Sequence, residues 1–205
     1  MWIQETSEPS EPSKLDFASI REQIFDVKAP SSNASEIDWL NYGNQLWRSF
    51  QFDQAIAAFE RAIQLNPNSH YAYYGKGLVF EAQGENRQAK DAYQQATELA
   101  PDFYPAWRKL GYTFRQLKQY PQAVTAFNQA IQLAPKDFVL YIERGLAYKN
   151  LKEYQAAIAS YSQAIEIQPH PWAYNNRGLA YVELKEYQAA IADYNQALKL
   201  NPNFA

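Results

Sequence analysis

One feature constrains this chain more than any other: its prolines, glycines, alanines and aromatic residues recur every 34 residues. Pro67, Pro101, Pro135 and Pro169 keep this interval, and Pro202 follows after 33 residues. Four further sets keep the same steps: glycine at 43, 77, 111, 145 and 178, alanine at 55, 89, 123, 157 and 190, an aromatic residue four positions after each alanine, and another four positions before each glycine. A fixed period of this length is typical of repeat architectures, in which each repeat is one supersecondary unit.

Each repeat contains two stretches with the periodicity of an amphipathic helix. In the second stretch of the third repeat, apolar residues follow helical spacing at Ala123, Ala126, Phe127, Ala130 and Ile131. The recurring proline cannot continue this second helix and marks its end. The recurring glycine of the first helix is expected to lie opposite the recurring alanine, where two small residues would let the helices approach closely. The pattern therefore predicts two packed helices per repeat and an all-α fold.

The third repeat also fits a known pattern, W-x₂-L-G-x₂-Y…A-x₃-F…P, with phenylalanine in place of its tyrosine. The matching residues are Trp107, Leu110, Gly111, Phe114, Ala123, Phe127 and Pro135. In this respect the chain resembles the tetratricopeptide repeat (TPR) family. The resemblance implies a right-handed superhelical solenoid of antiparallel helix pairs and a non-catalytic role in protein–protein interaction. It covers residues 36–204 as five repeats, 36–69, 70–103, 104–137, 138–170 and 171–204.

Residues 1–35 precede the repeats and form an acidic arm. Residues 1–14 are polar and include two Glu-Pro-Ser units, which predicts disorder. Within residues 15–27, Phe17, Ile20, Ile24 and Val27 fall on one face of an expected short helix. This helix could cap the first repeat, occupy the groove of its own or a second copy, or dock on something else.

The family resemblance implies that the first helices line a concave groove that holds a peptide or helical segment of another protein. Repeat three carries five Lys or Arg residues against one Asp or Glu, which suggests a basic centre to this groove. A partner with apolar and acidic residues is therefore expected. The expected contact residues are Asn44, Trp47, Tyr71, Tyr74, Leu78, Arg108, Tyr112, Arg115, Ile142, Leu146, Lys149, Trp172 and Asn175.

Two other sets of positions bear on function. In the TPR co-chaperones that hold two carboxylates, a clamp of Lys, Asn and Arg falls at positions where this chain has Leu40, Asn44, Gly75, Pro105 and Lys109. Only two of these fit, which argues against that subtype. Lys76, Arg144 and Arg177 replace the usual leucine at the seventh repeat position, where their stems are expected to cover apolar surface and their charged ends to reach water.

The end of the last repeat suggests an alternative role. Tyr181, Tyr194 and Leu198 are expected to be partly exposed there, because no further helix follows to cover them. The alternative is therefore a homo-oligomerising scaffold that uses this face, or the regulatory part of a longer TPR protein.

Composition and motifs exclude several other classes. The chain has no cysteine and two histidines, and it carries no phosphate-binding loop or hydrolase motif, so we expect no catalytic residue, cofactor or metal site. A net charge of −3 disfavours nucleic-acid binding. No apolar run reaches the roughly 20 residues that span a bilayer, and the acidic N-terminus does not fit a secretory signal. We expect a cytoplasmic location by default.

Overall fold

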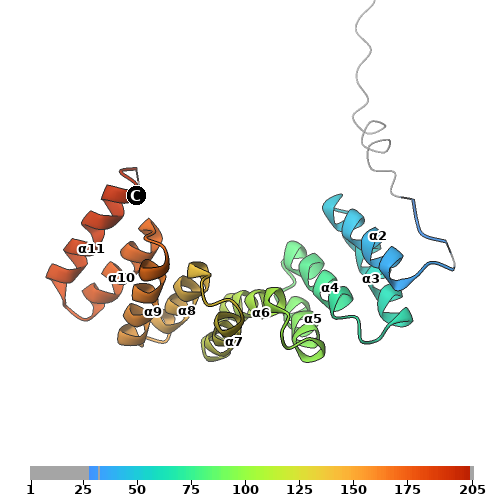
Figure 1. Ribbon diagram of the computed structural model, residues 1–205, viewed down its shortest axis with the longest axis horizontal. Coiled ribbons are helices and arrows are strands. Elements are labelled where there is room, and N and C mark those ends of the chain that lie inside the picture. Colours follow the sequence, from blue (N-terminus) through green and yellow to red (C-terminus); the bar gives the residue numbers. More distant parts are fainter. Residues whose placement is uncertain (1–27, 32, 204–205) are drawn as a thin grey trace, which may run out of the picture.

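The computed structural model describes residues 28–31 and 33–203, and within them the chain forms ten helices and no strand (Figure 1). The helix expected at 15–27 lies outside these residues, as does the segment 1–14 for which disorder is predicted. The helices are α2 (Glu36–Arg48), α3 (Phe52–Leu65), α4 (His70–Gln83), α5 (Asn86–Leu99), α6 (Tyr104–Gln116), α7 (Tyr120–Leu133), α8 (Phe138–Asn150), α9 (Tyr154–Ile167), α10 (Pro171–Glu183) and α11 (Tyr187–Leu200).

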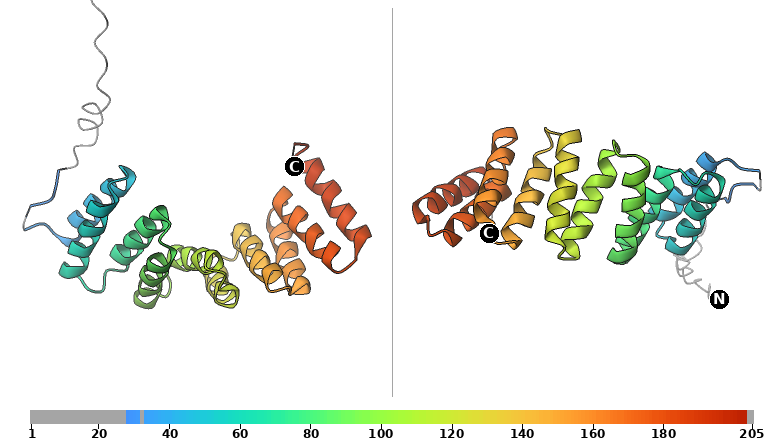
Figure 2. Two further views of the ribbon diagram at one scale, coloured as in Figure 1. Left: turned by 180° about the vertical axis from the view of Figure 1, so that it is seen from behind. Right: turned by 90° about the horizontal axis from the view of Figure 1, so that it is seen from below.

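Consecutive helices form five antiparallel pairs that stack in one curved row. The most extensive contacts lie within the pairs α2/α3, α4/α5, α6/α7, α8/α9 and α10/α11, and each second helix also packs on the first helix of the next pair. Figure 2 shows the row from behind and from below. The predicted all-α, right-handed solenoid of helix pairs is confirmed.

The turn inside each pair requires one residue in the left-handed backbone region. Gly84 occupies it in the second pair, with a φ of 77°. In the other four pairs a side-chain-bearing residue adopts a φ of 58–63°, at Phe50, Lys118, Lys152 and Lys185. The next residue donates its N–H to the carbonyl five residues back; Gln119 N, for example, lies 2.8 Å from Phe114 O. This closing hydrogen bond offsets the unfavourable backbone conformation and directs the chain into the second helix.

A ring-on-glycine contact holds the two helices of each pair together. A Cβ atom added at Gly111 would lie 2.6 Å from the ring of Phe127, which is 0% exposed. Glycine is therefore needed at this position because an aromatic ring lies directly against it. The corresponding contacts are Gly43–Phe59, Gly77–Tyr93, Gly145–Tyr161 and Gly178–Tyr194. Phe59 also touches Gly75 of the next pair, so one ring can bridge two repeats.

The first helices line the inner side of the curve. In Figure 1, α6 lies above α7, and α8 lies nearer the middle of the arch than α9, so the first helices of these central pairs face its open side. Consistent with the shorter inner path, α2 contacts α4, α6 contacts α8 and α8 contacts α10. Among the helices that the structure describes, the second helices of neighbouring pairs make no comparable contact. None of these helices is long and apolar enough to cross a membrane.

Candidate concave binding surface

The expected contact residues all lie on the first helices, but they differ in exposure. Tyr71 and Trp172 are the most open, each 55% exposed. Those that are half-buried are Asn44, Trp47, Tyr74, Leu78, Arg108, Tyr112, Arg115, Leu146, Lys149 and Asn175. Ile142 has to be corrected, because it is only 5% exposed and packs in the core with Tyr141 and Tyr161. A partner on the surface has no access to its side chain.

An aromatic cluster, defined by His70, Tyr71, Tyr74 and Phe103, covers the N-terminal half of α4. The ring of Phe103 stands edge-on to Tyr71 at 5.3 Å and to Tyr74 at 5.1 Å between centroids. The His70 ring lies 5.1 Å from Phe103. Aromatic pairs at these separations and angles stabilise one another beyond simple burial. Tyr71 is therefore held in place by its neighbours although more than half of it is exposed.

A second feature, the tyrosine–arginine stripe, consists of Tyr104, Arg108 and Tyr112 at four-residue spacing along α6. The Arg108 guanidinium lies 5.8 Å from the centre of the Tyr104 ring. Tyr112 packs edge-on against the core ring of Phe127 at 5.6 Å, and burial raises the pKa of its hydroxyl to about 12. The hydroxyl thus stays protonated at neutral pH. The stripe combines two ring surfaces with one cation between them.

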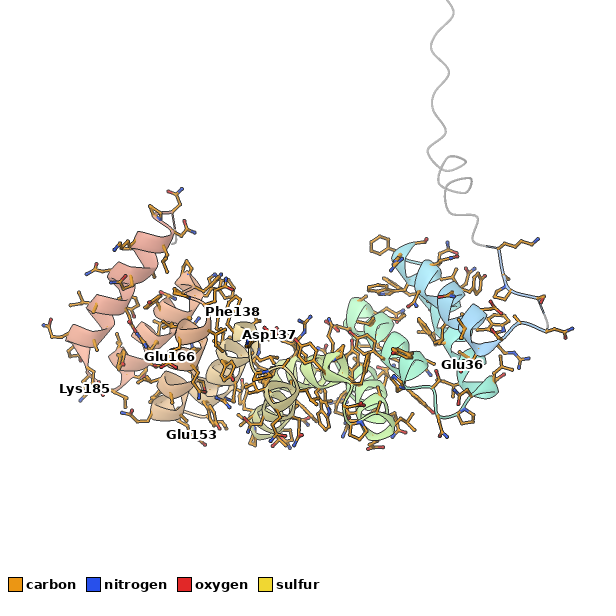
Figure 3. All side chains as sticks on the ribbon, viewed as in Figure 1. Glu36, Asp137, Phe138, Glu153, Glu166 and Lys185 are labelled. Carbon is orange, nitrogen blue, oxygen red and sulfur yellow. The ribbon has the colours of Figure 1, made fainter. Side chains whose placement is uncertain are left out.

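Among the residues that the structure describes, none places a carboxylate close to Arg108. Its Nη1 is 3.9 Å from Asp137 Oδ2 and 3.4 Å from the Tyr104 hydroxyl oxygen. The oxygens of Asp137 have other donors, because Oδ1 accepts the N–H of Val139 at 3.0 Å and Oδ2 accepts the hydroxyl of Tyr104. Figure 3 shows Asp137 and Phe138 at the start of α8, on the inner side of the curve. The Arg108 side chain is 40% exposed, so it can meet a ligand.

The neighbouring cations are paired across repeat boundaries. Lys109 Nζ lies 2.8 Å from Glu81 Oε1, and Arg115 Nε lies 2.9 Å from Glu143 Oε2. Burial raises the pKa of Glu143, and the nearby Arg115 opposes this rise. The expected basic centre is therefore largely neutralised. Charge counted repeat by repeat hides this, because each carboxylate belongs to the adjacent repeat.

Lys149 faces a neutral partner instead. Its Nζ lies 3.3 Å from Asn176 Oδ1, and burial lowers the pKa of this lysine while Glu183 opposes the shift. Within the described part of the chain, Arg108 and Lys149 are thus the two expected groove cations without a carboxylate at close range.

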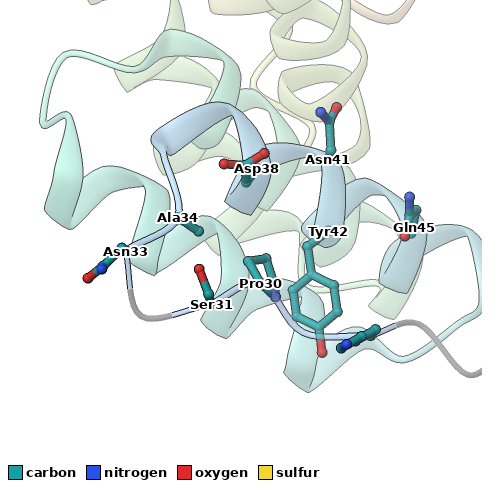
Figure 4. A pocket seen from close by; sticks show the side chains of 9 residues that line it. Pro30, Ser31, Asn33, Ala34, Asp38, Asn41, Tyr42 and Gln45 are labelled. Carbon is teal, nitrogen blue, oxygen red and sulfur yellow. The ribbon is translucent and has the colours of Figure 1, made fainter.

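Two hollows adjoin α6 and α2. One, of about 340 Å³, lies at the C-terminal end of the stripe and is lined by Glu81, Asn86, Lys109, Tyr112, Thr113 and Gln116. The other, of about 460 Å³, lies between the segment preceding α2 and α2 itself, where Pro30 and Ser31 face Asp38 and Tyr42 (Figure 4). This second hollow has no counterpart in the sequence prediction. Among the residues that the structure describes, no group of three or more acidic or histidine side chains could hold a metal ion.

Two of the three seventh-position cations, Arg144 and Arg177, differ from their predicted arrangement. Arg177 makes a two-pronged contact with Asp193, with both N···O distances 2.7 Å, and Arg144 donates to Ser160 and Asn128. The charged ends therefore lie among neighbouring helices and bind polar groups there, which corrects the expectation that they reach water. A sequence signal existed, because each arginine has a polar residue 16 positions later.

The proposed self-association residues are exposed to different degrees. Tyr181 and Tyr194 are half-buried, and Leu198 is 47% exposed. The same helix, α11, also exposes Tyr187 by 56% and Ile191 by 53%. Apolar surface is thus present on α11.

Comparison with known proteins matches most of the helical part to one family. Residues 139–171 and 171–204 each match a tetratricopeptide repeat, residues 80–138 match a second description of the tetratricopeptide repeat, and residues 43–84 match a TPR repeat. A TPR repeat-containing protein of Methanocaldococcus jannaschii, MJ1428, is 34% identical over 53 residues. This alignment covers 26% of the present chain and 9% of that relative's length.

Solved structures with the same fold cover most of the chain. YrrB, described as a TPR protein with an unusual peptide-binding site, superposes with a TM-score of 0.76 at 22% identity, covering 91% of this chain and 92% of its own. MamA from Desulfovibrio magneticus RS-1 superposes with a TM-score of 0.77 at 18% identity, covering 85% and 99%. At these identities the likeness is one of fold.

Proposed function

Because the chain belongs to the tetratricopeptide repeat family, we propose that it is a non-catalytic interaction scaffold that holds a partner segment against its concave face. The family consists of protein-interaction modules, and the present fold is theirs. The observation that supports a groove site most directly is the tyrosine–arginine stripe of α6. It presents apolar ring surface beside Arg108, whose nearest carboxylate is 3.9 Å away. A partner with apolar residues and at least one carboxylate fits this combination.

The expected affinity is modest. Burying three apolar side chains of a partner contributes about 5–9 kcal/mol before the opposing terms. Lost translational freedom and the ordering of a flexible segment offset much of this gain. Micromolar dissociation constants are therefore the natural scale for a single segment.

The first prediction concerns the groove. The double variant Arg108→Glu, Tyr112→Ala is expected to lose the partner that the wild-type chain captures from an extract of the source cells. The reversed charge repels a carboxylate, and the missing ring removes apolar contact area. The measurement is a quantitative comparison of proteins retained by immobilised wild type and variant.

A matched control separates binding from general surface effects. The variant Arg87→Glu, Tyr120→Ala makes the same exchanges on the second helices α5 and α7, and it is expected to capture the partner as wild type does. Circular dichroism should show equal helix content in all three proteins. Equal capture by the groove variant would move the binding site away from α6.

Self-association through α11 is a second candidate function, supported by the exposure of Leu198 and Ile191. Under this alternative, Ile191→Glu, Leu198→Glu is expected to reduce the mass in sedimentation equilibrium to that of a single chain, because two charges cannot be buried unpaired in an apolar contact. A wild-type chain that is monomeric at high concentration would rule this candidate out.

A further inference from the structure

We infer that the partner segment is extended, runs along α6, and carries an apolar, an acidic and a second apolar residue at alternate positions. This inference rests on the proposed function and specifies its ligand. The acidic residue lies opposite Arg108, and the two apolar residues lie against Tyr104 and Tyr112.

The spacing of the stripe is the first argument. Neighbouring members are four residues apart on a helix that rises 1.5 Å per residue, so they are about 6 Å apart along its axis. Alternate residues of an extended chain point to the same side and are about 6.6 Å apart. The three side chains of the stripe therefore match three alternate residues of a short extended segment. The expected ligand sequence is apolar–x–acidic–x–apolar, where x is any residue.

The hydrogen bonds of Asp137 explain why the acidic position falls at Arg108. Asp137 already accepts from Val139 N and from the Tyr104 hydroxyl, and its contact with Arg108 is long. In addition, the Arg108 side chain is 40% exposed, so a ligand can approach its guanidinium. The guanidinium therefore has N–H groups available to a ligand, and its planar geometry suits a carboxylate that accepts two parallel hydrogen bonds.

The other charges on α6 restrict the ligand to one acidic residue. Lys109 and Arg115 are bound to Glu81 and Glu143 within 3 Å. A second carboxylate beside either cation would approach these glutamates and be repelled by them. An acidic residue is therefore favoured only at the centre of the segment, between its apolar residues.

Backbone chemistry favours an extended ligand over a helical one. An extended segment has N–H and C=O groups that need partners, whereas a helix satisfies most of its own. The hollow beside Tyr112 is lined in part by Asn86 and Gln116, whose side-chain amides can pair with a ligand backbone. A short helix is also marginal in water, so a helical ligand would first have to order itself.

The test uses fluorescent peptides titrated into the full chain and followed by anisotropy. The first contains Leu-Ser-Asp-Ser-Leu between flanking serines. The second has the same composition with the leucines adjacent and the aspartate at the end. The third places each leucine four residues from the aspartate, as a helical ligand would require. We expect micromolar binding of the first peptide and at least about tenfold weaker binding of the other two.

Variants tie the binding to the stripe. Arg108→Gln and Tyr112→Ala are each expected to weaken the first peptide by about tenfold or more, and Arg87→Gln, on the outer helix α5, is expected to leave it unchanged. Equal binding of the first two peptides, or tighter binding of the third, would overturn the extended register while leaving groove recognition intact. The extended register would also be overturned if the first peptide did not bind although the chain still captured a partner through Arg108. If the chain neither bound this peptide nor captured a partner through Arg108, the proposed groove function would be rejected as well.

Discussion

Replacing Phe127 by alanine is expected to lower the free energy of unfolding of the central repeats by about 3–5 kcal/mol. The ring is 0% exposed and lies between α7 and the backbone of α6 at Gly111. It also supports Tyr112 through an edge-on contact at 5.6 Å. Truncation leaves a cavity in the wedge between helices that cannot close without moving a whole repeat. Urea denaturation followed by circular dichroism measures the loss.

A size exchange tests whether the ring and the glycine act as one unit. Gly111→Leu alone is expected to destabilise by about 1–3 kcal/mol, because the new side chain overlaps the ring. In the Phe127→Ala background the same leucine enters the vacated space and should restore part of the stability. Leu133→Ala, a truncation of a 41% exposed residue on the same helix, is the control and should have a small effect. Additive losses in the double variant would contradict a direct contact.

The helix pairs were predictable from the sequence because their determinants are local and repeated. A period of 34 residues, helical spacing and terminal prolines act within one repeat and are reinforced by four other copies. The partner of each glycine was not predictable in the same way. The close approach of the Phe127 ring to Gly111 depends on the register of two helices across a turn. The turn between these helices places Lys118 in the left-handed backbone region, which residue spacing alone does not reveal.

The sequence predicted which helices carry the groove residues, because the first helix of each pair lies inside the curve. Ile142 fell out of the predicted set because a position that faces the groove in one repeat is covered by its neighbours in another. Burial of this kind depends on the sizes of surrounding side chains, which differ between repeats even where the period is kept.

The charge of the groove was predicted least well, because the ion pairs that neutralise it join side chains of adjacent repeats. Side chains at the twelfth position of one repeat meet those at the sixth position of the next, as in Glu81 with Lys109 and Arg115 with Glu143. These pairs neutralise two of the three cations of α6 and connect adjacent repeats. Among the described residues, Arg108 is the α6 cation that remains for a partner, and Lys149 on α8 is the other groove cation without a close carboxylate. The preference for acidic ligands proposed above therefore rests on single cations and not on a basic surface.

Removing the carboxylate of Asp193 is expected to have the other large effect, a loss of about 3–5 kcal/mol in the stability of the α10/α11 pair. The Asp193 side chain is 7% exposed, and it accepts two hydrogen bonds of 2.7 Å from Arg177, whose side chain is 19% exposed. In Asp193→Ala the guanidinium stays largely buried without its counter-ion. Because each repeat contacts only its neighbours, faster amide hydrogen exchange is expected in α10 and α11 and little change in α4 and α5.

Burial, and not the mere presence of an ion pair, is the proposed cause of this loss, and the chain offers a matched control. Lys76 occupies the same seventh position as Arg177 and pairs with Glu60 at 2.9 Å, but the Glu60 side chain is 52% exposed. Glu60→Ala is therefore expected to destabilise by under about 1 kcal/mol. The double exchange Arg177→Met, Asp193→Leu should recover much of the loss, because it removes both charges and keeps apolar volume. Equal losses of stability in Glu60→Ala and Asp193→Ala would contradict this explanation, because they would show that burial does not determine how much these ion pairs contribute.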